Sequence, residues 1–190
     1  LDVEPDLTKF PGWINADGRT RSRMLDAAKK FLDVFDPGTD NWLGIDYRYF
    51  PAEAGYKSLR LLQSVAPDML ASLHVDRWAG WVPIILHYLY SNEVSESDSS
   101  EALAALAYSK APEAVRTILP ELIRDEDRKD RFTTVLEGLK SIWDESLSDA
   151  VFPLIQEGGL RERTAQAILK QLFAKGYKPV SAFSEGLIGQ

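Results

Sequence analysis

The sequence predicts an all-α protein, and three observations along its 190 residues support this fold class. Apolar residues recur every three or four positions in successive segments, which is the spacing of one face of a helix. Short polar stretches with proline or glycine separate these segments, and no segment alternates with the period of two that a strand requires. Helices joined by short connections pack antiparallel, so we expect about eight helices, arranged in pairs as a HEAT-like α-solenoid or as an irregular helical bundle.

Residues 1–90 contain three predicted helices. The first begins at Thr20 or Ser22, either of which can cap it, and ends before Pro37-Gly38. The second begins at Pro51 and ends before Pro67, after which one short helical turn follows. The third begins around Asp76. The residues expected to face the core from the first helix are Met24, Ala27, Ala28, Phe31 and Phe35, and those from the third are Trp78, Val82, Ile85 and Leu89.

Residues 98–190 contain the other five predicted helices, and an acidic, serine-rich loop at 91–97 joins the two parts of one domain, 1–190. The fourth helix begins at Asp98 and the fifth at Pro112, and a sixth covers 132–142. The seventh ends at Gly158-Gly159 and the eighth at Gly176. The apolar stripe of the fifth helix is Val115, Ile118, Leu119, Leu122 and Ile123.

Three prolines inside apolar stripes favour the solenoid over the bundle. Pro83, Pro120 and Pro153 should each kink the helix that contains it, and an irregular HEAT-like array needs such curvature. The helix starts near residues 97, 127 and 160 also recur at roughly 30 to 33 residues, within the range of helical-pair repeats.

Composition and charge exclude several classes of protein. The chain has no cysteine, so it has no disulfide framework and no thiolate nucleophile. Its net charge of −7 disfavours binding to nucleic acid or to an anionic membrane. No apolar run reaches the roughly 18 residues that a membrane span needs. The chain begins with Leu1 and an acidic stretch unlike a signal peptide, so we expect a cytoplasmic fragment of a larger multidomain protein.

Motifs for catalysis or metal binding are incomplete. Gly55-Tyr56-Lys57-Ser58 lacks the spacing of a phosphate-binding loop, so Gly55 is expected only to let two helices approach. Asn15-Ala16-Asp17-Gly18 resembles part of a calcium loop without its terminal carboxylates, and His74 and His87 lack partners for a metal site. We therefore expect no catalytic residue, metal or cofactor.

The connection 36–50 is the candidate binding segment, because aromatic residues beside an arginine are typical of interface anchors. Its candidate contact residues are Trp42, Tyr47, Arg48 and Tyr49. The alternative is that the segment folds back and covers the ends of the first two helices.

Several stretches of residues 10–90 resemble the helical region that follows the ATPase core in bacterial NACHT-type (STAND) signal-transduction ATPases. They are Phe10-Pro11-Gly12-Trp13, the run from Met24 to Leu32, the run from Ala54 to Leu62, Pro67-Asp68, and Trp78-Ala79-Gly80-Trp81-Val82-Pro83-Ile84-Ile85. The resemblance implies a helical sensor or scaffold segment without nucleotide motifs of its own.

Together these features predict a non-catalytic helical domain that recognises another macromolecule, either a protein partner or the remaining domains of its own full-length chain. It would be the ligand-sensing part of a NACHT-type ATPase in bacterial defence or signalling. The alternative is a small-ligand-binding or catalytic domain with a pocket near Trp78, Trp81 and His87. A purely structural spacer is a third interpretation.

Overall fold

The computed structural model describes residues 6–45, 49–89, 97–131 and 133–188, and within these ranges the chain is helical and contains no strand. The all-α prediction is therefore confirmed. In the first half the elements are η1 (Leu7–Lys9), α1 (Pro11–Ile14), α2 (Gly18–Val34), η2 (Thr39–Asn41), α3 (Phe50–Val65), α4 (Pro67–Ala71) and α5 (Val75–His87). In the second half they are α6 (Ser97–Lys110), α7 (Pro112–Arg128), α8 (Thr134–Gly138), η4 (Lys140–Ile142), α9 (Glu145–Glu157), α10 (Glu162–Ala174) and α11 (Lys178–Ile188).

The described residues thus form eleven α-helices rather than about eight. The three additional ones are α1, α4, which was expected as a single short turn, and α11, which follows the predicted stop at Gly176. The predicted helix at 132–142 is instead divided into α8 and η4. The predicted loop at 91–97 lies outside the described residues except for Ser97, where α6 begins.

The cap of α2 was wrongly placed at Thr20 or Ser22. The Asp17 carboxylate accepts a hydrogen bond from the backbone N–H of Thr20 at 2.7 Å, so α2 begins earlier, at Gly18. Aspartate caps as well as serine because its oxygen reaches the third helical N–H. These hydrogen bonds lower the pKa of Asp17.

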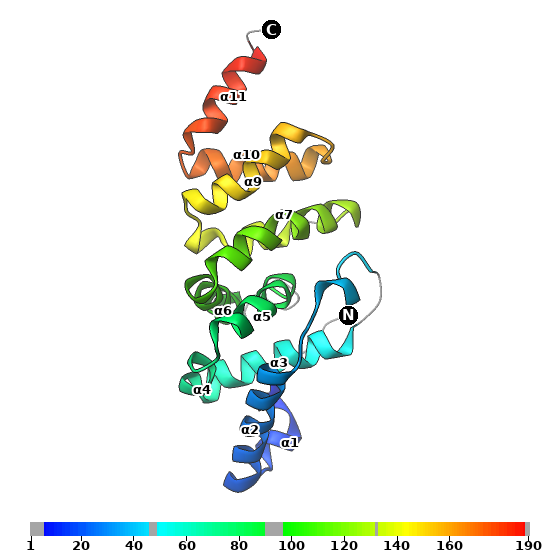
Figure 1. Ribbon diagram of the computed structural model, residues 1–190, viewed down its shortest axis with the longest axis vertical. Coiled ribbons are helices and arrows are strands. Elements are labelled where there is room, and N and C mark those ends of the chain that lie inside the picture. Colours follow the sequence, from blue (N-terminus) through cyan, green and yellow to red (C-terminus); the bar gives the residue numbers. More distant parts are fainter. Residues whose placement is uncertain (1–5, 46–48, 90–96, 132, 189–190) are drawn as a thin grey trace.

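The helices follow one another along the long axis of the molecule, from α1 and α2 at one end to α11 at the other (Figure 1). Contacts run between chain neighbours, such as α2 with α3, α6 with α7, and α9 with α10. They also run between next-but-one helices, in the series α3, α5, α7, α9 and in the series α6, α8, α10. Two helical layers therefore extend side by side along the axis.

Three of the helices in the first series share a proline at the same place. Pro83, Pro120 and Pro153 each occupy the ninth position of α5, α7 and α9, and each helix continues past its proline. The two residues before each proline are buried: Trp81-Val82, Ile118-Leu119 and Val151-Phe152. Contacting helices of one layer therefore repeat the same short pattern of two core residues followed by proline.

The core is one continuous cluster of buried apolar side chains that extends across both halves of the chain. In its N-terminal part, Trp81 is completely buried and its Nε1 donates to the Leu32 carbonyl at 3.0 Å. Gly55 lies against this indole, since a Cβ at Gly55 would be 2.0 Å from Trp81 Cζ3. The expectation that Gly55 permits close approach of two helices, α3 and α5, is confirmed.

Candidate functional site

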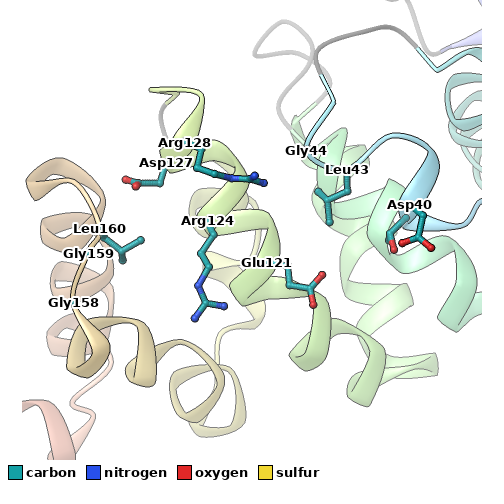
Figure 2. Close-up of a pocket in the computed structure, with 11 residues that line it drawn as sticks. Asp40, Leu43, Gly44, Glu121, Arg124, Asp127, Arg128, Gly158, Gly159 and Leu160 are labelled. Atoms are coloured by element: carbon teal, nitrogen blue, oxygen red, sulfur yellow. The ribbon is translucent and has the colours of Figure 1, made fainter.

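One candidate site is a cleft of about 760 Å³ formed by three segments that are far apart in the sequence (Figure 2). Residues 39–44 form one side, the C-terminal half of α7 forms the floor, and the turn between α9 and α10 forms the other side. The lining residues are Thr39, Asp40, Leu43, Gly44, Glu121, Arg124, Asp127, Arg128, Gly158, Gly159 and Leu160. We refer to this site as the α7 cleft.

Segment 39–44 is held against α5 by its own Trp42 side chain. The Trp42 side chain is 5% exposed and packs against the His87 ring, with 4.9 Å between ring centroids. Gly44 has φ of +81° and lies beside Arg128. A Cβ at position 44 would be 3.4 Å from the Nη2 of this arginine. Glycine suits this position since other residues rarely adopt such a φ.

The turn at 158–160 is fixed to α7 by a hydrogen bond from the backbone N–H of the next residue to a side chain of α7. Gly158 and Gly159 have φ of +71° and +85°, and the predicted end of the helix at this pair is confirmed. Two residues later, the Arg161 N–H donates to the Asp127 carboxylate at 3.2 Å. Figure 2 shows the Asp127 side chain directed toward this turn. Asp127 is buried at the end of α7, so the turn and the helix are positioned together.

Both arginines of the α7 cleft already have carboxylate partners within the chain. Arg124 Nη2 is 2.7 Å from Glu157 Oε2, and Arg128 Nη2 is 3.1 Å from Asp125 Oδ1. Asp125 also pairs with Lys129 Nζ at 2.9 Å. In Figure 2, Arg124 extends across the space between α7 and the turn, while Arg128 points toward Gly44.

The two other exposed carboxylates of the cleft have no such compensation. Asp40 and Glu121 make no ion pair or side-chain hydrogen bond with any residue that the structure describes. The uncompensated charge of the cleft is therefore negative. The only large apolar surfaces in its lining are Leu43 and Leu160, on opposite sides.

Glu126, also near the end of α7, is a half-buried acid that sequence reasoning missed. Its side chain accepts a hydrogen bond from the Thr134 hydroxyl, while Oε2 is buried with no hydrogen-bond partner among the described residues. Burial raises the pKa of Glu126 to about 7. No local pattern marks this position, because its contact with Thr134 forms only when α8 packs against α7.

His87 is a second perturbed group. Burial, and next the positive charge of Lys129, lower the pKa of His87 to about 4, so its ring is neutral at pH 7. Tyr88 contacts it edge-on and Trp42 covers it, so its environment is aromatic rather than that of a metal ligand.

The residues singled out from the sequence are distributed differently. Trp42 is buried, Tyr49 is half-buried against the core at the start of α3, and Tyr47 and Arg48 lie outside the described residues. Direct contact with a partner stays a prediction for these residues, while their neighbours Asp40, Leu43 and Gly44 line the cleft.

The alternative pocket was placed near Trp78, Trp81 and His87. Trp78 and Trp81 are both 0% exposed, so neither indole offers surface to a ligand.

Comparisons with protein-family models, with curated proteins and with solved structures found no match for this chain. Among the described helices, none combines the length and apolar character needed to cross a bilayer. Within the same residues, no cluster of three or more histidine, aspartate or glutamate side chains is arranged to hold a metal ion.

Proposed function

We propose that this chain is a non-catalytic, HEAT-like α-solenoid that binds another protein through the α7 cleft. Two observations support the solenoid. Successive helices contact both their neighbours and the helices next but one, which is how stacked helical pairs bury their faces. The proline pattern of α5, α7 and α9 repeats at the same helical position, as expected when each pair occupies an equivalent place.

The observation that carries the binding proposal is the charge of the α7 cleft. Pockets for small molecules are lined mainly by apolar and aromatic side chains. This cleft is instead lined mainly by charged side chains and glycines, with one leucine on each side. A polypeptide segment with a basic residue and a neighbouring apolar one fits it, because the basic residue can pair with Asp40 or Glu121 while the apolar one contacts Leu43 or Leu160.

Binding of such a segment would bias the arrangement of the helices. The α7 cleft connects residue 40, the middle of the chain and residue 160, so an occupant contacts three parts of the stack at once. A ligand shifts a conformational equilibrium by the difference in its affinity for the two states. A domain built in this way can report binding to an attached module, which is the role implied by the resemblance to NACHT-type ATPases.

The cleft is tested with two labelled peptides of equal length, one alternating lysine and leucine and the other alternating glutamate and leucine. Fluorescence anisotropy should show tighter binding of the lysine peptide. The double variant Asp40→Asn, Glu121→Gln should weaken that binding about three- to tenfold, since each exposed ion pair contributes up to about 1 kcal/mol.

The matched control is Asp26→Asn, Asp68→Asn, which removes the same charge from exposed positions outside the cleft. Equal losses in both double variants would mean that the peptide responds only to net charge, and the cleft would be the wrong site. The ATPase connection is tested separately on the full gene product, where a Walker-type loop upstream is expected. A gene product without one contradicts that part of the proposal.

A further inference from the structure

A second cavity, of about 340 Å³, lies where α3 meets the first turn of α6. Six of its seven lining residues have polar side chains; the full lining is Asp6, Arg60, Gln63, Ser64, Asp98, Ser99 and Ala102. The Gln63 amide donates to the Ser99 carbonyl at 2.9 Å and so fixes α3 to the beginning of α6. We refer to this cavity as the Arg60 pocket. It shares no lining residue with the α7 cleft.

The central feature of the pocket is a buried arginine that has no carboxylate partner among the residues that the structure describes. Arg60 is 7% exposed, and its Nη1 donates to the Ser100 hydroxyl at 2.8 Å and to the Tyr56 hydroxyl at 3.4 Å. No carboxylate of the described residues lies within ion-pair distance of it, and its Nε and Nη2 donate to no acceptor there. A guanidinium carries five N–H donors in a planar fork that matches a carboxylate, so this arrangement leaves part of the fork available.

The first turn of α6 places the positive end of a helix dipole beside the pocket. α6 has 14 residues, and Asp98 and Ser99 of its first turn line the cavity. The first backbone N–H groups of a helix have no partner within the helix, and the helix dipole places a partial positive charge there. Buried charges in proteins are normally paired, so a desolvated guanidinium beside a helix N-terminus favours an incoming anion.

Two carboxylates restrict which anion fits. Asp6 and Asp98 line the same cavity, and Asp98 is exposed at its rim. Their charge opposes a multiply charged anion such as phosphate much more than a single carboxylate.

We propose that the Arg60 pocket binds a carboxylate group carrying a single negative charge, held by Arg60 Nε and Nη2. The carboxylate can belong to a free small acid or to the C-terminus of a peptide. This inference is independent of the α7 cleft, because neither site contributes a residue to the other.

The test follows the Nε–H resonance of Arg60 in an ¹H–¹⁵N NMR titration of the whole chain at constant ionic strength. The probes are acetate, N-acetyl-Ala-Ala, its C-terminal amide and inorganic phosphate, with chloride as the reference salt. Acetate should shift the resonance saturably, and the amide should not shift it. A shift from N-acetyl-Ala-Ala as well as acetate assigns the site to peptide C-termini, whereas acetate alone assigns it to small acids. No saturable shift with acetate, or a larger response to phosphate, overturns the proposal.

Variants separate binding from a purely structural role of Arg60. Arg60→Gln should weaken acetate binding at least about tenfold, because it removes a charge-assisted hydrogen-bond pair. Asp6→Asn, which can still cap η1, should instead strengthen acetate binding about two- to fivefold by removing a repelling charge. Arg23→Gln, at an exposed position outside the pocket, is the matched control and should leave the affinity for acetate unchanged. If Arg60→Gln does not fold, the wild-type titration and Asp6→Asn decide, and an unchanged or weaker affinity in Asp6→Asn contradicts the proposal.

Discussion

Replacing Gly55 with alanine tests how closely α3 and α5 are packed. The added Cβ would lie 2.0 Å from Trp81 Cζ3 and 2.3 Å from Cη2. Ordinary carbon–carbon contacts are about 3.5 Å or longer, so the indole and the Cβ must separate by about 1.5 Å. Trp81 has no room to do so freely, because its ring is completely buried and its Nε1 is bonded to Leu32.

The expected cost is set by two opposing effects. Alanine in a helix interior is favoured over glycine by about 0.5 to 1 kcal/mol. Overpacking a well-packed core costs about 1 to 3 kcal/mol, and loss of the Trp81 hydrogen bond adds about 1 kcal/mol. Gly55→Ala should therefore lower the free energy of unfolding by about 2 kcal/mol, and the Tm of a chain of this length by about 4 to 8 °C.

The assay is urea unfolding followed by circular dichroism at 222 nm, which reports the helix content of the chain. Gly18→Ala is the matched control, since a Cβ at that position meets nothing within 4 Å. It should leave the urea midpoint unchanged or slightly raised. Trp81→Phe removes the ring atoms that clash, so in the Gly55→Ala background its cost should be smaller than in the wild type by about 1 kcal/mol or more. A Gly55→Ala midpoint equal to that of wild type, or strictly additive effects of the two substitutions, would refute the packing argument.

Three further predictions concern titration, hydrogen bonding and burial. Because burial raises the pKa of Glu126 from 4.5 to about 7, this acid should lower stability progressively as pH rises between those values and cause no further loss above about 7. Burial lowers the pKa of His87 from 6.5 to about 4, so this residue should make the protein less stable as pH falls through that range. Both the wild type and Glu126→Gln contain His87, so the difference between their urea midpoints isolates the effect of Glu126. A difference that does not change with pH contradicts the assignment. Tyr177→Phe removes a 2.6 Å hydrogen bond to Asp149 and should cost about 1 kcal/mol by urea unfolding, whereas an unchanged midpoint would mean that water replaces the bond without loss. Trp42→Ala should cost about 3 to 5 kcal/mol and expose His87, whose pKa, measured by NMR titration, should rise toward 6.5; a pKa that stays near 4 would show that Trp42 is not what buries the ring.

Local periodicity predicts a helix face well where the helix has neighbours on its apolar side. All five residues of the predicted stripe from Val115 to Ile123 are buried, because α7 contacts α5 and α6 on one side of the stack and α8 and α9 on the other. In α2, at the end of the stack, the prediction was less accurate. Its buried residues are Ala28 and Leu32, while the predicted Ala27 is exposed. Helix α2 packs mainly on α3, and the Trp81 Nε1 of α5 donates to the Leu32 carbonyl.

The α7 cleft could not be predicted in the same way. Asp40, Glu121 and Gly159 belong to segments that only the stacking of helices brings together, and none carries a local motif. One signal was available and was missed. Aligning the chain on Pro83, Pro120 and Pro153, rather than on the helix starts, places two apolar residues before each proline, and these residues are buried in α5, α7 and α9.

The α7 cleft touches the stack at three successive levels, and this has a mechanical consequence. In the α-solenoid proposed above, bending is easiest between adjacent helical pairs, because each pair is held chiefly by its nearest neighbours. A ligand bound against segment 39–44, α7 and the Gly158-Gly159 turn would restrict bending between these three segments. Ligand binding would then reduce the flexibility of the helical array, including parts that the ligand does not contact.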